Sequence, residues 1–376
     1  MMDALGLNET LLLGSRKFYF ETNYLEEENR VVAHSFEDGV ALDSRERRLS
    51  PDADEKDIQN TVKVLQRESI REIEVLFYIQ KKVWRKRHAL SYNKLGVIFL
   101  KKNLIKDAQK NLQEAIAIDE NFIDAHKNLA VCFIHSQQFD RALKVLEKAI
   151  EKRPDLPDLY NYKGVALLGE KNFIDSVQAF EKALSLNENF SLAHLNLGLA
   201  YLTGLVESPV HPQLLPLEER QKKSIEHLRI AFELKKELQT PEYSAIVQKV
   251  ENSQFREALD ELLEIHKNVA FSLNSVLENE FYLNFMFGGK SKDEGAVANY
   301  IEGLKEEIAL HPRYPDLYNH LGVAYLIQCR NLFLRALGEF RRAIKLNPEY
   351  KQARKNLKLA ENEGKGLLIL LRALLK

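Results

Sequence analysis

The feature that most constrains the fold of this chain is a segment that repeats at a fixed period. Three ungapped segments begin at Leu90, Asp124 and Asp158, each 34 residues after the one before. A unit of this length cannot bury a core alone and gains stability by stacking on its neighbours. The period therefore predicts an elongated array of small units.

Within each unit, small and bulky residues recur at matching positions. The first half has a small residue followed three positions later by a bulky one, as in Gly96 and Phe99 or Gly164 and Leu167. The second half reads small, bulky, small, with Ala108, Leu112 and Ala115 in the first unit. A small residue lets two helices approach closely, and a bulky one fills the gap between units.

This pattern resembles the tetratricopeptide repeat, a helix–turn–helix unit of the same period. The resemblance covers about residues 89–360 and implies a mainly α fold, a right-handed superhelical solenoid of helix pairs. In a fourth unit the spacing from Leu197 to Ser224 is 27 positions, against 13 from Leu95 to Ala108. The extra residues include three prolines and predict an inserted loop near residues 204–219.

Three further units bring the predicted total to about seven helix pairs. A weaker fifth unit spans about Pro241 to His266, and a degenerate sixth has one helix near residues 268–287 and another around Tyr300. The seventh is clear again in Tyr318, Gly322, Tyr325, Ala336 and Phe340, with an inter-helix link two residues longer than in the first units. A lone helix over Lys351–Ala360 and an apolar C-terminal segment follow.

The first ninety residues follow different rules. Segments rich in β-branched and aromatic residues, with Asp38-Gly39 between two of them, predict a small antiparallel β-meander over about residues 11–48. Apolar residues at helical spacing then predict a long amphipathic helix from Asp54 to Arg87. The predicted domains are a β-meander unit over 1–50, a linker helix over 51–88 and the solenoid over 89–376.

Composition excludes several classes of protein. The net charge of −1 gives no global reason to bind nucleic acid. Two cysteines far apart in sequence form neither a disulfide framework nor a metal site, which favours a reducing compartment. No window is apolar enough to span a bilayer, and the N-terminus makes a poor signal peptide. We therefore expect a cytoplasmic protein.

The sequence offers no catalytic motif, and neither a cofactor nor a metal is expected. The basic run around Trp84 could contact phosphates, but we interpret it as a solvated helix end. The glycines at Gly288-Gly289 imitate a phosphate-binding loop, yet that loop's first glycine would fall on Asn284, so we interpret them as a turn. His126 and His194 occupy an aromatic position of the repeat and are interpreted as packing residues. An enzyme is not predicted.

The resemblance implies that the first helix of each unit lines a concave groove. Asparagine amides offer a donor and an acceptor to a peptide backbone, and an apolar row follows one turn later. The predicted peptide-binding residues are Asn93, Val97, Lys127, Asn128, Val131, Asn161, Val165, Asn196 and Leu199. Alternatively, the asparagines make local bonds, and the superhelix or the N-terminal region covers the apolar row.

The predicted function is a non-catalytic scaffold that binds an extended peptide or a helix of a protein partner. Lys127 matches one lysine of the chaperone-type carboxylate clamp, but Val131 replaces the clamp's asparagine and the later basic pair is absent. A second hypothesis is a membrane-associated assembly or regulatory factor that uses the apolar C-terminal helix. Capping of the last repeat is the favoured role of that helix.

Overall fold

The computed structural model describes residues 6–210, 213–269, 276–287, 294–310 and 315–374. The chain divides into two compact units, Met1–Asn274 and Ser275–Lys376. The predicted loop motif at Gly288–Ser291 lies outside the described residues. The predicted domain ranges 1–50, 51–88 and 89–376 remain a prediction, because compactness alone does not separate the β-meander from the repeats that follow it.

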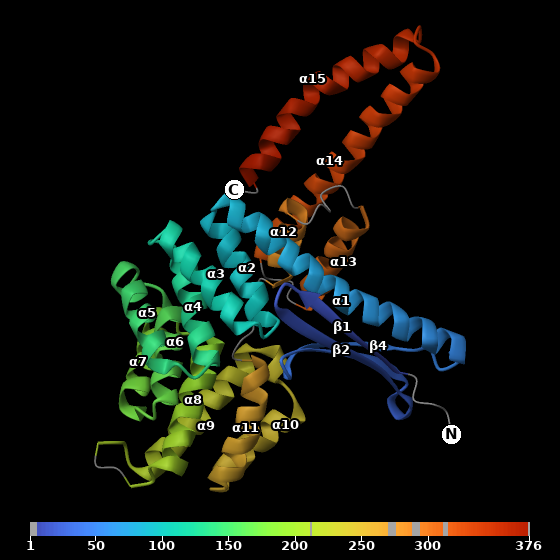
Figure 1. Ribbon diagram of the computed structural model, residues 1–376. Helices are drawn as coiled ribbons and strands as arrows, with labels where there is room; N and C mark the ends of the chain where they lie inside the picture. Colours follow the sequence, from blue (N-terminus) through green and yellow to red (C-terminus); the bar gives the residue numbers. More distant parts are fainter. Residues whose placement is uncertain (1–5, 211–212, 270–275, 288–293, 311–314, 375–376) are drawn as a thin grey trace. The chain divides into compact units, whose positions relative to one another are not determined.

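The N-terminal β-meander is confirmed and has four antiparallel strands in chain order: β1 (Gly6–Leu13), β2 (Arg16–Leu25), β3 (Arg30–Glu37) and β4 (Val40–Arg48) (Figure 1). It begins a few residues earlier than predicted. The β3–β4 hairpin turns at Asp38 and Gly39, whose φ angles of 49° and 81° are both positive. Two positive φ angles are the mark of a type I′ turn, which is why Asp-Gly predicted it.

One face of the sheet is covered by α1 (Glu55–Lys86), the predicted amphipathic helix. Asp54 and Asp57 form a capping box at its start, and Arg87 ends it with a φ of 45°. Phe77 of α1 lies 5.5 Å, centroid to centroid, from Phe18 of the sheet and from Phe99 of the first repeat. The sheet, α1 and the first repeat therefore share one core.

Ion pairs fasten the sheet to the same repeat. Arg16 of β2 contacts Glu37 and, at 2.8 Å, Asp107 of the first repeat. The buried amine of Lys102 contacts Asp43 of β4 and, at 2.8 Å, Glu72 of α1. Burial disfavours the charged form of Lys102, but the two carboxylates outweigh it and raise the pKa of this lysine. The β-meander is thus held on the repeat array by charge as well as by packing.

Ten helices follow in pairs along the first unit. They are α2 (Ala89–Lys101), α3 (Ile105–Ile118), α4 (Ile123–His135), α5 (Phe139–Lys152), α6 (Pro157–Gly169), α7 (Phe173–Leu186), α8 (Ser191–Glu207), α9 (Leu217–Leu234), α10 (Pro241–Glu251) and α11 (Phe255–Val269). A residue with positive φ makes the turn inside four of the pairs: Asn103, Gln137, Lys171 and Ser253. Such a residue stops the first helix and redirects the chain.

The predicted close approach of the paired helices is present. A Cβ added to Gly96 would lie 2.6 Å from Leu112, and one added to Gly164 would lie 2.5 Å from the ring of Phe180. Both distances are far below van der Waals contact, so only glycine fits opposite the bulky residue. The small residue in mid-helix therefore sets the distance between the two helices of a repeat.

The second unit holds α12 (Val276–Met286), α13 (Glu294–Leu310), α14 (Pro315–Leu346) and α15 (Lys351–Leu374). The predicted inter-helix link of the seventh repeat is wrong, because α14 is one helix of 32 residues. Its middle, Gln328–Arg335, has no glycine or proline and no residue with positive φ, so nothing interrupts the helix. The last helix also continues past Ala360.

The insertion of the fourth repeat is only partly a loop, because α8 and α9 are both longer than their counterparts. Arg220, at the start of α9, is 3% exposed and holds the remaining segment. Its guanidinium donates to the carbonyl oxygens of Gly204 (2.7 Å), Ser208 (3.0 Å), Pro209 (2.7 Å) and Leu215 (2.8 Å). The Gly204 carbonyl also accepts the backbone N–H of Ser208 at the end of α8, so Arg220 is a second donor there and ties the segment after α8 to α9.

We expect Arg220→Ala to destabilise the first unit by about 2–3 kcal/mol, because it removes the four hydrogen bonds of a buried guanidinium. Urea unfolding followed by circular dichroism measures this change. Lys222→Ala, at an exposed position of the same helix, is the control and should change stability by less than about 0.5 kcal/mol. Equal unfolding midpoints for the two variants would show that the carbonyls are satisfied without the arginine.

Candidate functional site

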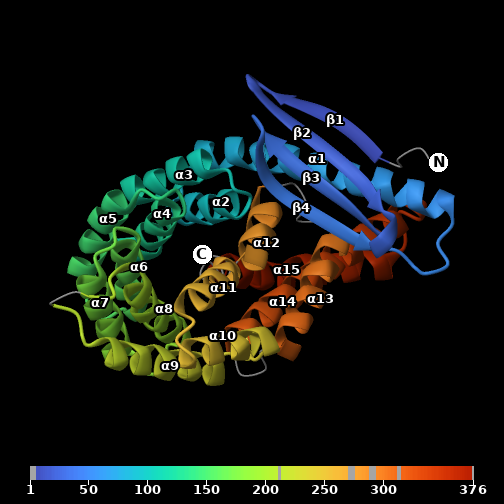
Figure 2. The same ribbon diagram turned by 90° about the horizontal axis from the view of Figure 1, so that it is seen from below.

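The first helices of successive repeats, α2, α4, α6 and α8, are neighbours and line the inside of the curve formed by α2–α9 (Figure 2). All nine predicted peptide-binding residues lie on these helices. Lys127, Asn128 and Val165 are part-exposed, and the other six are buried: Asn93, Val97, Val131, Asn161, Asn196 and Leu199. A partner approaching this surface, which we call the inner row, would therefore meet only part of the predicted set.

The asparagines of the inner row bond to one another. Asn128 Nδ2 donates to Asn93 Oδ1 at 2.9 Å, and Asn196 Nδ2 donates to Asn161 Oδ1 at 2.8 Å. Both bonds join residues 35 positions apart, so each links the first helices of successive repeats. The amides therefore link neighbouring repeats, and peptide binding by the same residues remains a prediction.

Some hydrogen-bonding capacity remains after these links. Asn161 is fully buried, and its Nδ2 has no hydrogen-bond partner within the described part of the chain. A buried amide donor without a partner costs on the order of 1–3 kcal/mol. A carbonyl oxygen brought to this position by a bound segment would remove that cost.

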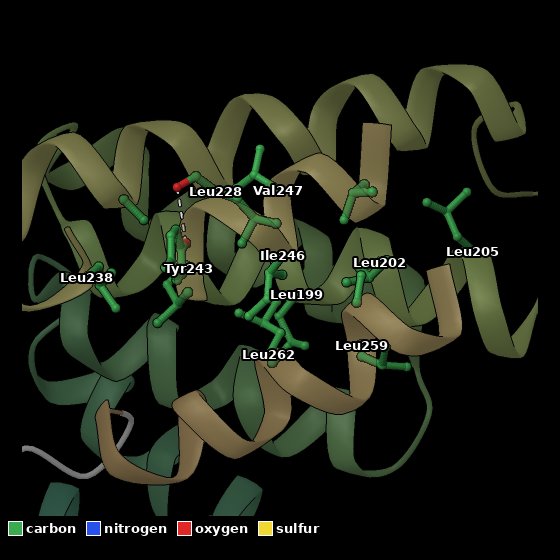
Figure 3. Close-up of a cluster of buried hydrophobic side chains, with 14 residues drawn as sticks. Leu199, Leu202, Leu205, Leu228, Leu238, Tyr243, Ile246, Val247, Leu259 and Leu262 are labelled. Atoms are coloured by element: carbon green, nitrogen blue, oxygen red, sulfur yellow. Dashed lines mark hydrogen bonds between the residues drawn. The ribbon is translucent and has the colours of Figure 1, made fainter. Parts of the chain in front are cut away.

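The inner row continues after α8 with α11, the second helix of the fifth pair (Figure 2). The first helix of that pair, α10, packs on α9 instead. Leu259 and Leu262 of α11 join the buried cluster around Leu199 (Figure 3). His266 Nε2 lies 2.6 Å from Asn196 Oδ1, so that amide is also covered by α11.

No pattern in the sequence indicates this placement of α11. Its turn residue, Ser253, has the same φ of about 61° as Lys171 in a regular pair. Its small–bulky pair, Ala258 and Leu262, is spaced as in the other second helices. The contact of His266 with Asn196 could not be predicted for the same reason, because the sequence of α11 follows the pattern of a regular second helix.

Lys127 is engaged by two carboxylates. Its amine lies 3.1 Å from Asp124 and 3.1 Å from Asp158 of the next repeat. Burial disfavours the charged form of Lys127, but the nearby carboxylates outweigh it and raise the pKa of the amine. Lys127 therefore stays protonated, and its charge is already balanced by two carboxylates. It is poorly suited to bind the C-terminal carboxylate of a peptide.

Comparison with known proteins bears on these repeats directly. The family model of the tetratricopeptide repeat (TPR) matches residues 99–163, which run from the last turn of α2 to the middle of α6. The helix pairs within this range are TPRs. No curated protein matches the sequence.

Several solved structures are similar to part of the chain. MamA is 18% identical, over 49% of this chain and 96% of its own, with a TM-score of 0.35. MamA from Desulfovibrio magneticus RS-1 is 18% identical over 46% of this chain and 93% of its own, with a TM-score of 0.36. YrrB, described as a TPR protein with an unusual peptide-binding site, is 17% identical over 52% and 96%, with a TM-score of 0.34.

The histidines of the TPR aromatic position are packing residues in the structure. His126 is 4% exposed and His194 is 7% exposed. The Nε2 atom of each lies 2.9 Å from a backbone carbonyl oxygen, that of Glu120 or Glu188. His194 also lies against His227, 3.0 Å between Nδ1 atoms. Within the described ranges, no three His, Cys, Asp or Glu side chains gather as a metal site would require.

The basic run at the end of α1 is also occupied by internal contacts. Trp84 Nε1 donates to Asn111 Oδ1 at 3.2 Å, and the amine of Lys110 lies 4.3 Å from the centre of its ring. Lys110 thus covers one face of the ring, and the indole N–H is already bonded within the chain. The helix-end interpretation fits these contacts.

The TPR array also has a hollow of about 350 Å³ that the sequence did not indicate. It lies between α5, α6 and α7, away from the nine predicted residues. Leu143, Tyr160, Lys163 and Lys182 are among the residues that line it. Glu147 and Asp175 add carboxylates to its lining, so the hollow is a second surface of mixed apolar and charged groups that a protein partner could contact.

Acidification should weaken the contact between α11 and the inner row. Burial lowers the pKa of His266 from 6.5 to about 4. The unfolded chain therefore binds the proton first, so this stabilisation is complete above pH 6.5 and is lost as the pH falls toward 4. At pH 5 the loss should be on the order of 1–2 kcal/mol.

His266→Gln tests this, because the glutamine amide can still donate to Asn196 but does not titrate. We expect the wild-type free energy of unfolding to fall more between pH 7.5 and pH 5 than that of the variant, as measured in urea. The comparison removes contributions from His227 and other groups common to both proteins. Parallel pH profiles would mean that His266 is not held neutral by burial.

Proposed function

We propose that this protein is a non-catalytic scaffold that binds an extended peptide or an amphipathic helix of a protein partner on the inner row of its TPRs. The observation that carries the proposal is α11. This helix lies on the inner row, with leucines in the apolar cluster at Leu199 and a polar contact to Asn196. A partner helix presenting the same chemistry to α4 and α6 would bind in the same manner.

The part-exposed residues define where such a partner makes its first contacts. Val165 of α6 offers an apolar surface beside a buried cluster of α7 and α8 residues. Asn128 and Lys127 of α4 lie on the preceding first helix and carry polar groups at its border. Deeper contacts with Val97, Val131 or Asn161 require a partner to reach side chains that are buried in the structure.

The alternative hypothesis, a membrane-associated assembly factor, rests on the apolar C-terminal segment alone. The structure continues α15 through that segment to Leu374. Among the described residues, no helix is both long and apolar enough to cross a membrane. No observation on the described residues favours membrane attachment, so the scaffold is the function that we propose.

Two matched substitutions test which surface binds the partner. Val165→Ser changes a part-exposed apolar residue of the inner row, and Leu143→Ser makes the same kind of change in the hollow between α5 and α7. A side chain buried by a partner contributes about 1–1.5 kcal/mol, so we expect Val165→Ser to weaken partner binding about five- to tenfold. Leu143→Ser should leave it unchanged.

Affinity capture with the full-length chain and its variants, followed by titration of the purified partner, measures the effect. Circular dichroism verifies that both variants stay helical. The full-length chain is required, because a form starting at Ala89 would expose Phe99 by removing Phe77. Weakened binding in Leu143→Ser alone would place the partner in the hollow and refute binding on the inner row.

A further inference from the structure

The two halves of the seventh repeat cannot contact each other within α14. In the regular repeats the mid-helix glycine meets a bulky residue of the second helix, as Gly164 meets Phe180. The corresponding residues of the seventh repeat are Gly322 and Phe340. They lie 18 residues apart on one helix, which places them about five turns or roughly 27 Å apart.

The face that this contact would bury is open to solvent. Tyr325 is 46% exposed, whereas the residues at its position in other repeats, such as Phe99 and Phe133, are at most 2% exposed. A Cβ added to Gly322 would meet no atom within 4 Å. Leu332, in the middle of α14, is 56% exposed. An aromatic residue, a leucine and a glycine at a helix-packing position thus lie uncovered on one helix.

These residues belong to a continuous stripe. Its members recur at alternating intervals of four and three residues along α14: Tyr318, Gly322, Tyr325, Cys329, Leu332 and Ala336. This period of 3.5 residues keeps a stripe on one side of a helix and is the spacing of coiled-coil seams. The opposite side packs on α13 through the buried residues Ala324 and Ile327.

The stripe is complementary to itself when two copies run antiparallel. In one register Tyr325 lies opposite Ala336 of the second copy, Gly322 lies within one residue of the level of Phe340, and Cys329 lies opposite Leu332. The first two layers match a large residue with a small one, and two-fold symmetry repeats each layer. They are the same pairs that regular repeats bury, since Phe99, Ala108 and Leu112 occupy these positions in the first TPR and are fully buried.

We propose that α14 is the opened form of the last TPR and that two copies of the chain exchange its halves in a homodimer. The first half of α14 from one copy then packs on the second half from the other. A second copy is the occupant that fits, because it carries the missing small and bulky residues at the required spacing. Closure within one chain would require a turn, and the segment between Tyr325 and Ala336 is helical throughout.

Two glycines of α14 provide a matched test. At both Gly322 and Gly338 an added Cβ has nothing within 4 Å, so neither position is closed to a side chain. Gly322 faces the proposed dimer contact, and Gly338 is turned about 160° from it around the helix axis. Gly322→Leu would place leucine against Phe340 of the second copy, twice in each dimer.

Sedimentation equilibrium of the full-length chain gives the result directly. We expect the wild type and Gly338→Leu to be dimers, and Gly322→Leu to dissociate with a Kd raised at least about 100-fold. A monomeric wild type, or a Gly322→Leu variant as dimeric as the wild type, would overturn the proposal. Circular dichroism confirms that the compared variants remain folded.

Cross-linking distinguishes exchange from closure within one chain. Tyr325→Cys and Ala336→Cys are combined in a Cys329→Ser background, where the remaining Cys132 is fully buried. A short bis-maleimide should then join two chains, giving a dimer band on a denaturing gel. A cross-linked monomer would show that the seventh repeat closes on itself, and no cross-link would show that the stripes do not meet; either result rejects the exchange.

Discussion

The close approach of two helices around a small residue is the contact on which the rest of this structure depends. Gly96 and Gly164 each lie so near a bulky side chain of the paired helix that no Cβ fits between them. This contact sets the distance and angle within a pair. Because a small residue recurs at this position in the first helices from α2 to α8, these pairs stack in a similar way and produce a curve. The inner row of first helices is a consequence of that stacking.

The N-terminal β-meander depends on the array in turn. A four-stranded sheet with one apolar face needs a partner to bury it. Here α1 covers the face, and its Phe77 packs against both Phe18 of the sheet and Phe99 of the first TPR. Arg16 and Lys102 add ion pairs between the same elements. The first repeat, which has no TPR before it, is thus capped by the sheet and its helix, so the end of the solenoid is not left exposed.

The small and bulky residues of the repeat recur in the later helices, but those helices pack differently. In the fifth pair the second helix lies on the inner row and packs against Leu199 and Asn196. In α14 the signature residues are present, but the helix does not turn back, which leaves their contact surface exposed. Both departures begin where the regular stacking of first helices ends, after α8.

The sequence by itself determined the repeat, the extent of α1, the Asp-Gly hairpin and the mid-helix glycine contacts. Each of these features depends on residues that are near one another in the chain or on a period that recurs along it. The spacing of small, apolar and turn residues therefore predicts them directly. It also located the inner-row asparagines without revealing that Asn128 binds Asn93 and Asn196 binds Asn161.

Only the tertiary structure decided those pairings, the position of α11 and the continuity of α14. Each is a choice between partners of similar chemistry: an amide can bond to a neighbouring repeat or to a ligand, and an apolar helix face can pack on either row. Local propensity does not distinguish such alternatives, because their free energies differ only through contacts made across many repeats. A segment such as Gln328–Arg335 can likewise form a turn or remain helical. Here it is helical, and α13 and α15 pack along the continuous α14.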